Sequence, residues 1–412
     1  MKRKLAILAP LLAVVAAFAL CAAARGQVEP AVADGTAKFD YDLSYSQTSE
    51  FYAAYSGTQQ MGVASGDVEY LNGRGRTPFS LTYSGGYIAG ISGSESGTGV
   101  FQHLLISQGY FTRRGSLSLR DDLGFYPQSP TTGFSGIPGV GYLPGQPGPP
   151  IDSILALNVR SLNNTATATF SHELNYNTTF SVDGSYDSIR FPSGGSLDIN
   201  QVGMRPQVSW RLNALNSASV QYVFSRFNYI GSTFTMETQS VQPGYSRVWS
   251  RQLTTSVSAG PEWIGSDDEL KLPQTIGLSA NAGGTYAAKS TSVSLNFYRS
   301  VSAGAGLGAT IGIRNSDATA GISRAFGRDL TIGATGSYRN SQGFLQSGST
   351  NGEYGSVNAT RRIGEIITVS ASYTAFHQTS SLPLETSALN GLAQVIGFSV
   401  AYHPRENQVI RK

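Results

Sequence analysis

Long stretches of this chain alternate, residue by residue, between apolar or aromatic side chains and small polar ones. Between Thr178 and Ser188 one parity carries Phe180, Val182, Gly184 and Tyr186, and the other carries Ser181, Asp183, Ser185 and Asp187. The same alternation recurs over 253–263 and over 367–374. A period of two is the geometry of a β-strand with one dry face and one wet face. The pattern therefore predicts sheets whose two faces meet different surroundings.

The length of the alternating runs distinguishes a membrane sheet from a soluble one. Strands of globular proteins usually have about 5–6 residues, whereas a tilted strand needs about 9–11 residues to cross the hydrocarbon core of a bilayer. The runs here have the greater length. A backbone group left unpaired in lipid costs several kcal/mol, so the sheet has to close on itself. The sequence predicts an all-β, transmembrane, antiparallel up-and-down β-barrel.

Eighteen strands account for the pattern, and sixteen remains an alternative. The expected strands are 36–46, 62–72, 77–88, 99–112, 116–126, 163–176, 178–190, 198–212, 217–229, 233–249, 252–264, 274–287, 290–301, 314–325, 329–341, 352–363, 365–377 and 390–402. Short connections at 73–76, 113–115, 250–252, 287–289, 326–329 and 362–365 alternate with longer ones, among them 47–61, 89–98 and 378–389. Outer-membrane barrels show this asymmetry, with tight periplasmic turns and long extracellular loops.

Three segments depart from the regular pattern. The longest loop, 127–162, is rich in Pro and Gly, and two roles for it are weighed equally: a segment folded into the pore, or a cover facing the medium. Asp121 interrupts an apolar parity, for which a β-bulge that reverses the register is preferred over a position near the membrane interface. The stretch 386–394 is compatible with a short helix above the barrel.

Composition supports one barrel and excludes other classes of protein. Charged residues make up 13% of the 412 residues, about half of the roughly 25% usual in soluble domains. The 21 Tyr and 19 Phe argue against disorder. Without Lys2, Arg3 and Lys4, the 29 basic residues fall to 26, equal to the 26 acidic ones. A near-neutral chain of this kind gives no indication of nucleic-acid binding, which leaves a basic patch or stripe.

The first 24 residues have the three parts of a secretory signal peptide. A basic start is followed by an apolar run from Leu5 and by small residues up to Ala24. Cys21 lies within this segment and is the only cysteine, so the processed chain has no disulfide and no thiol chemistry. The predicted organisation is a signal peptide at 1–24, a periplasmic segment at 25–35, a barrel at 36–402 and a tail at 403–412.

These residues resemble those of bacterial outer-membrane β-barrel proteins of the porin-like kind. The resemblance covers 36–402 and depends on the signal peptide, the repeated hairpins and a last strand with Ile396, Phe398, Val400 and Tyr402 on one parity. It implies location in the bacterial outer membrane and insertion by the outer-membrane assembly machinery, which reads a final strand ending in an aromatic residue. This chain departs from that pattern by adding 403–412 after the aromatic residue.

No motif in the chain predicts an enzyme, a cofactor site or a metal site. None of the four histidines has a neighbour at metal-ligand spacing. A barrel hydrolase would need His377 to act with Ser380 or Ser381, and no orienting partner for such a pair can be named. The sequence predicts no catalytic, cofactor-binding or metal-binding residue.

The wet parity is where the sequence places function. Its side chains are mostly small and uncharged, and the candidate pore-lining charges are Arg120, Asp122, Asp183, Asp187, Arg211 and Arg339. Barrels of sixteen to eighteen strands hold an aqueous channel. A sparsely charged wall predicts passive diffusion of small hydrophilic solutes with weak ion selectivity. The alternatives are a structural or adhesive surface barrel without transport, and a secreted soluble β protein. Membrane lipid is the surrounding partner, and association of three barrels is left open.

Overall fold

The described part of the chain forms one closed sheet of eighteen antiparallel strands. The computed structural model describes residues 37–52, 57–73, 75–92, 98–127, 160–192, 198–232, 234–266, 275–302, 312–344, 348–381 and 391–404. The signal-peptide segment and 25–35 lie outside these residues, as does nearly all of the tail. The predicted all-β barrel and its eighteen strands are confirmed.

The strands follow one another around the barrel in chain order. They are β1 (Ala37–Tyr52), β2 (Gly57–Asn72), β3 (Phe79–Ser92), β4 (Gly99–Phe111), β5 (Gly115–Pro127), β6 (Arg160–Asn175), β7 (Thr178–Arg190), β8 (Ile199–Arg211), β9 (Asn216–Tyr229), β10 (Thr235–Val248), β11 (Leu253–Ser266), β12 (Thr275–Ala287), β13 (Thr291–Ser302), β14 (Ile313–Phe326), β15 (Leu330–Gly343), β16 (Ser349–Ile363), β17 (Ile367–Ser380) and β18 (Gly391–Tyr402). Each strand has 12 to 16 residues, enough to cross a bilayer when tilted.

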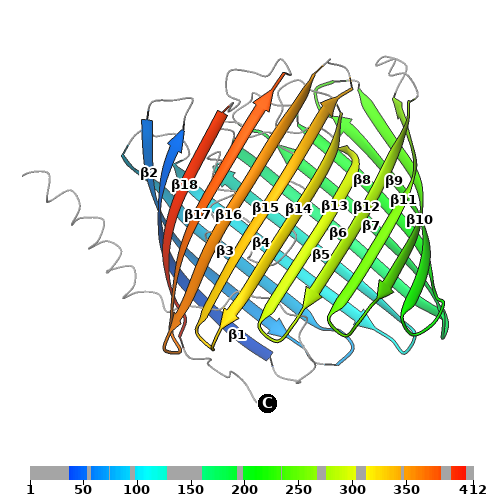
Figure 1. Ribbon diagram of the computed structural model, residues 1–412, viewed down its shortest axis with the longest axis horizontal. Helices are drawn as coiled ribbons and strands as arrows, with labels where there is room; N and C mark the ends of the chain where they lie inside the picture. Colours follow the sequence, from blue (N-terminus) through cyan, green and yellow to red (C-terminus); the bar gives the residue numbers. More distant parts are fainter. Residues whose placement is uncertain are drawn as a thin grey trace, which may run out of the picture.

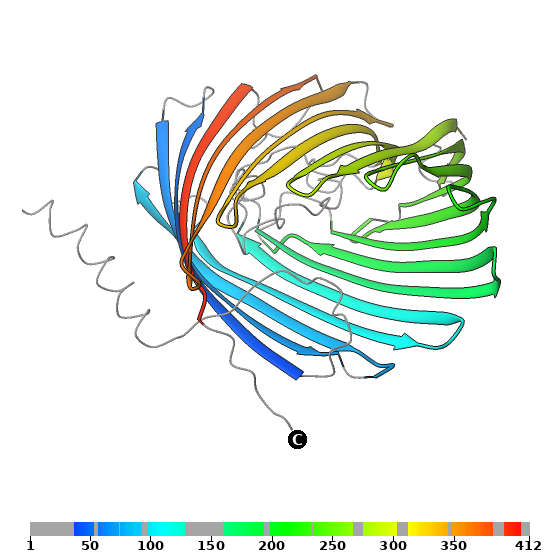
Figure 2. The same cartoon turned by 60° about the horizontal axis from the view of Figure 1, so that its bottom comes forward.

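Pairing of the first strand with the last closes the cylinder. β1 pairs with β2 from Ala37 to Tyr52, and it pairs with β18 from Leu43 opposite Tyr402 to Tyr52 opposite Ala393. Figures 1 and 2 show these two strands side by side, and the other strands tilted in the same sense around the barrel. Closure leaves no strand edge unpaired, which is the requirement that lipid imposes.

The two rims of the barrel differ in their connections. Most connections at one end are tight turns, such as the two residues between β6 and β7, and most at the other end are longer; the first two hairpins are exceptions, because four residues join β1 to β2 and six join β2 to β3. We call these ends the short-turn rim and the long-loop rim. At the short-turn rim Gly327 has a φ of 70°, a backbone conformation that glycine adopts without the steric cost of a Cβ atom. Both the start of β1 and the end of β18 lie at the short-turn rim (Figure 1).

Side-chain parity separates an apolar outer wall from a polar inner wall. On β18 the outer residues include Ile396 and Phe398, each 53% exposed, whereas Ser399 between Phe398 and Val400 is buried. Among the described residues, every strand except β2 carries at least one exposed large hydrophobic residue, for example Leu119 on β5, Val257 on β11 and Tyr373 on β17. A wall of exposed apolar side chains far exceeds what a water-soluble monomer presents.

The structure corrects the prediction for the first hairpin. The expected loop at 47–61 is largely sheet, because β1 continues to Tyr52 and β2 begins at Gly57. The segment carries polar residues on both parities, for example Gln47 and Thr48, so alternation gave no signal there. Ladder hydrogen bonds are made by the backbone and do not require an apolar outer face.

Two further predictions are wrong. The register of β5 with β4 and with β6 is continuous through Asp121, so no bulge turns this residue inward. Its carboxylate therefore faces outward, between the outward Leu119 and Leu123.

The suggested helix at 386–394 is also wrong in its second half, because Gly391 and the residues after it pair with β17. Of the predicted loop 127–162, Pro127 belongs to β5 and the residues from Arg160 belong to β6. The residues between them lie outside the described part of the chain.

Candidate functional site: the interior of the barrel

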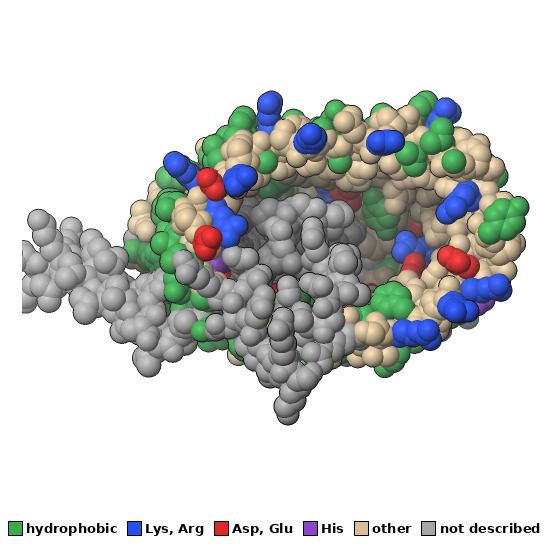
Figure 3. Space-filling view, turned by 90° about the horizontal axis from the view of Figure 1, so that it is seen from below, with side chains coloured by type: hydrophobic (Ala, Val, Ile, Leu, Met, Phe, Trp, Pro, Cys, Tyr) green, Lys and Arg blue, Asp and Glu red, His purple; other side chains and the backbone are tan. Residues whose placement is uncertain are grey.

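The inner wall is built from the wet parity of each strand. The six charged residues singled out from the sequence all lie on it: Arg120 and Asp122 on β5, Asp183 and Asp187 on β7, Arg211 on β8 and Arg339 on β15. Figure 3, viewed from the short-turn rim, shows the hollow of the barrel with Arg or Lys and Asp or Glu side chains inside it. The interior therefore presents both signs of charge to its contents.

Asp122 is the centre of an ion-paired group on β4 and β5. His103 Nε2 lies 2.6 Å from Asp122 Oδ1, and Arg120 Nη2 donates to Asp122 Oδ2 at 2.9 Å. Arg120 and Asp122 face the same side because they are two residues apart on one strand. His103 comes from the neighbouring strand β4, and its part in this group was not predicted. Both oxygens of the Asp122 carboxylate therefore have a side-chain partner.

Two further cross-strand ion pairs lie on the inner wall. Arg205 on β8 donates to Asp183 Oδ2 at 3.0 Å, and the two residues are direct register partners. Arg339 on β15 pairs in the same way with Asp317 on β14. Arg205 and Asp317 were missed because their partners are fixed by register between strands. Each arginine is therefore matched to a carboxylate, which weakens the field of that part of the wall.

The inner wall of β1 and β2 carries four carboxylates in a two-by-two array. Asp40 lies opposite Glu69, and Asp42 lies opposite Asp67. The His403 ring is hydrogen-bonded to the Asp42 carboxylate and to the Thr368 hydroxyl. Like charges directly opposite one another on a sheet repel. We call these four residues the acidic array, and sequence analysis did not place any of them at the site.

An apolar cluster fills one side of the interior near the long-loop rim. Its buried members come from the ends of β7 to β13 and are Phe191, Ile199, Phe227, Tyr229, Met236, Ile264 and Val301. The Tyr229 hydroxyl accepts a hydrogen bond from the Gly312 backbone N–H at 3.0 Å. Gly312 has a φ of 65°, and a Cβ there would lie 2.6 Å from the Met236 sulfur. The cluster joins β9, β10 and the start of β14, so this side of the rim is packed.

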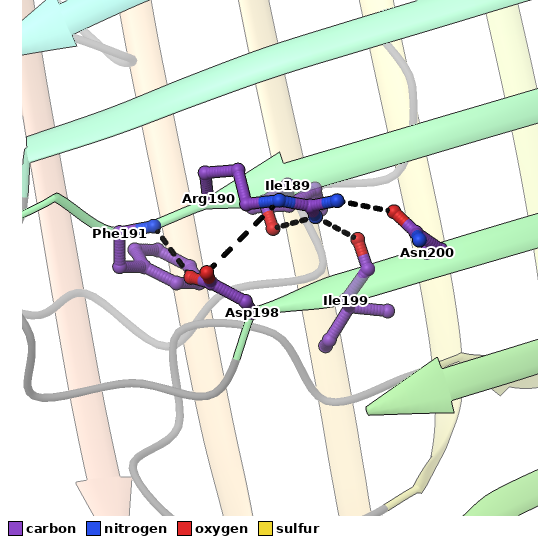
Figure 4. Close-up of polar contacts among 6 residues, drawn as sticks. All are labelled: Ile189, Arg190, Phe191, Asp198, Ile199 and Asn200. Atoms are coloured by element: carbon purple, nitrogen blue, oxygen red, sulfur yellow. Dashed lines mark hydrogen bonds and ion pairs between the residues drawn. The ribbon is translucent and has the colours of Figure 1, made fainter. Parts of the chain in front are cut away.

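Arg190 fixes the start of this cluster by holding the ends of β7 and β8 together (Figure 4). Its guanidinium donates to the Ile189 carbonyl at 2.9 Å, to the Ile199 carbonyl at 3.0 Å and to Asn200 Oδ1 at 2.7 Å. Asp198 Oδ1 accepts a hydrogen bond from the Phe191 backbone N–H at 2.8 Å. One arginine side chain thus binds two backbone carbonyls at the end of the β7–β8 ladder.

A buried polar network with residues from β9 to β12 lies where the backbones of β10 and β11 come close together, a region that we call the tight corner. Gln242 accepts a hydrogen bond from Gln221 at 2.7 Å and donates to Ser240 at 3.0 Å and to Ser279 at 2.8 Å. A Cβ at Gly260 would lie 1.8 Å from the Val241 carbonyl oxygen. Only glycine allows the two backbones to approach this closely.

The interior is not uniformly open to solvent. A second apolar cluster, Met61, Val63, Ile88 and Phe101, lies on the inner parity of β2 to β4, and each of its members is at most 3% exposed. Inward polar residues toward the long-loop rim are also buried, including Thr48, Glu50, Thr350 and Gln378. The inner wall is therefore closely packed at these positions.

The outer wall has polar pairs near the long-loop rim. Arg226 pairs with Glu237 at 3.3 Å, and His377 lies 3.8 Å from Glu353. His377 thus faces outward, whereas Ser380 is hydrogen-bonded to Thr350 on β16. The structure does not bring His377 and Ser380 together as a nucleophile and base.

Among the described residues, no three His, Cys, Asp or Glu side chains converge to hold a metal ion. That part of the chain also contains no helix with the length and hydropathy of a transmembrane helix.

Comparisons with known proteins gave likeness of fold only. No protein-family profile matches the chain, and no curated protein sequence matches it. Solved structures that resemble it include Pseudomonas aeruginosa OpdQ, at 10% identity over 89% of this chain and 98% of that one, with a TM-score of 0.45. Acinetobacter baumannii OccAB3 has 10% identity, covers 90% and 100%, and has a TM-score of 0.46. P. aeruginosa OccK2 in complex with glucuronate has 9% identity, covers 90% and 99%, and has a TM-score of 0.47.

Proposed function

We propose that this protein is an outer-membrane channel through which small hydrophilic solutes diffuse passively. The observation that carries the proposal is a closed barrel of eighteen strands with exposed apolar residues outside and polar and charged residues inside. An apolar outer wall suits the acyl chains of a bilayer, and a barrel of this strand number is wide enough to enclose an aqueous path. Transport of this kind requires no chemical step.

The inward charged residues are proposed to line the solute path. Arg120, Asp122, Asp183 and Arg339 lie in ion pairs, so solutes would meet fixed dipoles along much of the wall. Asp187 and Arg211 have no ion pair among the described residues. These two residues would act on ions more strongly than the paired ones do.

Export by a signal peptide at 1–24 and insertion by the outer-membrane assembly machinery complete the proposal. The aromatic Tyr402 at the end of β18 supports insertion by that route, and the chain continues past it. Size measurement of the refolded protein in detergent distinguishes a single barrel from an assembly of three.

A structural barrel without transport is the second candidate. The burial of inward residues toward the long-loop rim favours it, since Phe101 and Met236 are both fully buried. Conductance across a planar bilayer discriminates the two functions. Ohmic single-channel steps from refolded protein would support a channel, and insertion into vesicles without conductance would establish the structural role. A mature chain that stays monomeric in detergent-free buffer would contradict both and favour a secreted soluble protein.

A further inference from the structure

The acidic array brings four carboxylates together on two adjacent strands of the inner wall, and one of them, Asp42, is ion-paired with His403. The carboxylates of Asp122, Asp183 and Asp317 each contact an arginine. Among the described residues, the charged groups acting on Glu69 are the carboxylates of Asp40, Asp42 and Asp67. The array therefore brings several carboxylates close to Glu69 in one region of the wall.

Glu69 points into the array without satisfying its own hydrogen-bonding capacity. Its side chain is only 4% exposed, and its Oε1 atom has no hydrogen-bond partner among the described residues. A buried carboxylate oxygen without a donor is unfavourable, and such an atom in a native fold calls for a partner that binds there. Asp67 likewise has one buried oxygen, Oδ1, without a hydrogen-bond partner among the described residues.

The array is graded from the lumen inward. Asp40 and Asp67 are half-buried, whereas Asp42 and Glu69 are buried. Asp67 is held by the Ser84 hydroxyl, and His103 on β4 also acts electrostatically on it. A cation arriving through the lumen would meet Asp40 and Asp67 first and Glu69 last.

The spacing of the carboxylates selects the class of cation. Residues directly opposite on neighbouring strands have Cβ atoms about 4.5–5.5 Å apart, and residues two apart on one strand lie roughly 7 Å apart. No three of these side chains converge to hold a metal ion. An alkylammonium group instead carries three N–H donors that reach separate carboxylates without a fixed coordination geometry. Two such groups joined by a short aliphatic chain match the length of the array.

We propose that the acidic array is a binding site for aliphatic amines, and for diamines above all, within the lumen. This inference rests on the proposed function for the route by which the amine arrives. Binding itself requires only the folded barrel. The amine would donate hydrogen bonds to Glu69 Oε1 and to the Asp67 and Asp40 carboxylates.

Calorimetric titration of the refolded barrel in detergent with 1,4-diaminobutane tests the binding site. The uncharged analogue butane-1,4-diol is the matched control for size and shape. We expect saturable binding of the diamine and none of the diol. Glu69→Gln and Asp67→Asn should each weaken the diamine about tenfold, because each removes a charge-assisted hydrogen bond. Glu353→Gln removes a carboxylate from the outer wall and should leave binding unchanged.

Two readouts on the same preparation separate this inference from the proposed function. Far-UV circular dichroism checks that each variant is folded, and a planar-bilayer recording checks conductance. Equal affinity of wild type and both array variants, or equal binding of diol and diamine, would overturn the amine site even if the barrel conducts. Diamine binding without any conductance would keep the site and refute the channel.

Discussion

Asp121 gives the most direct test of which face of the barrel meets lipid. It is the seventh of the thirteen residues of β5, so it lies halfway between the two rims. Its outward neighbours on the strand, Leu119 and Leu123, are 40% and 37% exposed, and its register partners are Ile106 and Ala166. Neither a hydrogen bond nor an ion pair joins its carboxylate to another described residue.

We therefore expect Asp121→Leu to stabilise the folded barrel in lipid. A charged side chain at the midplane of the lipid face costs up to about 2–4 kcal/mol, with Asp at the lower end of that range. Leucine adds apolar contact worth about 1 kcal/mol at a half-exposed position. The sum predicts a free energy of unfolding that is higher by about 2–3 kcal/mol, and Asp121→Asn should give about half of that gain.

Urea unfolding in phospholipid vesicles, followed by tryptophan fluorescence, measures this change. Asp122→Leu is the matched control because it alters the adjacent residue on the opposite face. It removes the carboxylate that His103 and Arg120 contact, so it should lower stability. A loss of stability in Asp121→Leu would show that this carboxylate faces a polar partner, and the lipid-facing assignment of β5 would be wrong.

Three further outcomes follow from the inner wall and the corner. Arg205→Gln leaves Asp183 without its arginine and should raise the ratio of cation to anion permeability about two- to threefold. Reversal potentials measure this ratio. An unchanged ratio would show that the pair does not lie on the ion path. Arg339→Ala leaves a carboxylate that is 14% exposed without its arginine, which should cost about 1–3 kcal/mol in urea unfolding; no loss would contradict that pairing. Gly260→Ala puts a Cβ 1.8 Å from a carbonyl oxygen of β10 and should lower the free energy of unfolding by about 3 kcal/mol. The control Gly355→Ala, whose Cβ would have nothing within 4 Å, should lower it by under about 1 kcal/mol. Equal effects of the two variants would contradict the tight corner.

Most of the fold could be predicted from the sequence because alternation is a local property. Phe180 and Ser181 fall on opposite faces of β7 whatever strand lies beside them, since successive side chains of any strand point to opposite sides. Eighteen alternating runs, separated by connections that are short at every second position, specify strand number and both rims. The prediction failed at Gln47 to Met61, where polar residues occur on both parities and the side chains do not show the alternation of a membrane strand, although the backbone is paired.

The candidate site could be predicted only in part. Parity placed Asp183 and Arg339 on the wet face, but it did not identify Arg205 or Asp317 as their partners. The expectation that Asp121 sits on a bulge was wrong because a charged residue on an apolar parity was taken as evidence of a register change.

The sequence alone therefore determined the strand period, the strand count and the polarity of each wall. The tertiary structure decided which charges meet. Asp40 and Glu69 are separated by a hairpin and face each other because of the register between β1 and β2, and His403 reaches Asp42 because β1 closes on β18. Register and closure are set by the sum of all strand pairings around the cylinder, and no single stretch of sequence contains that information.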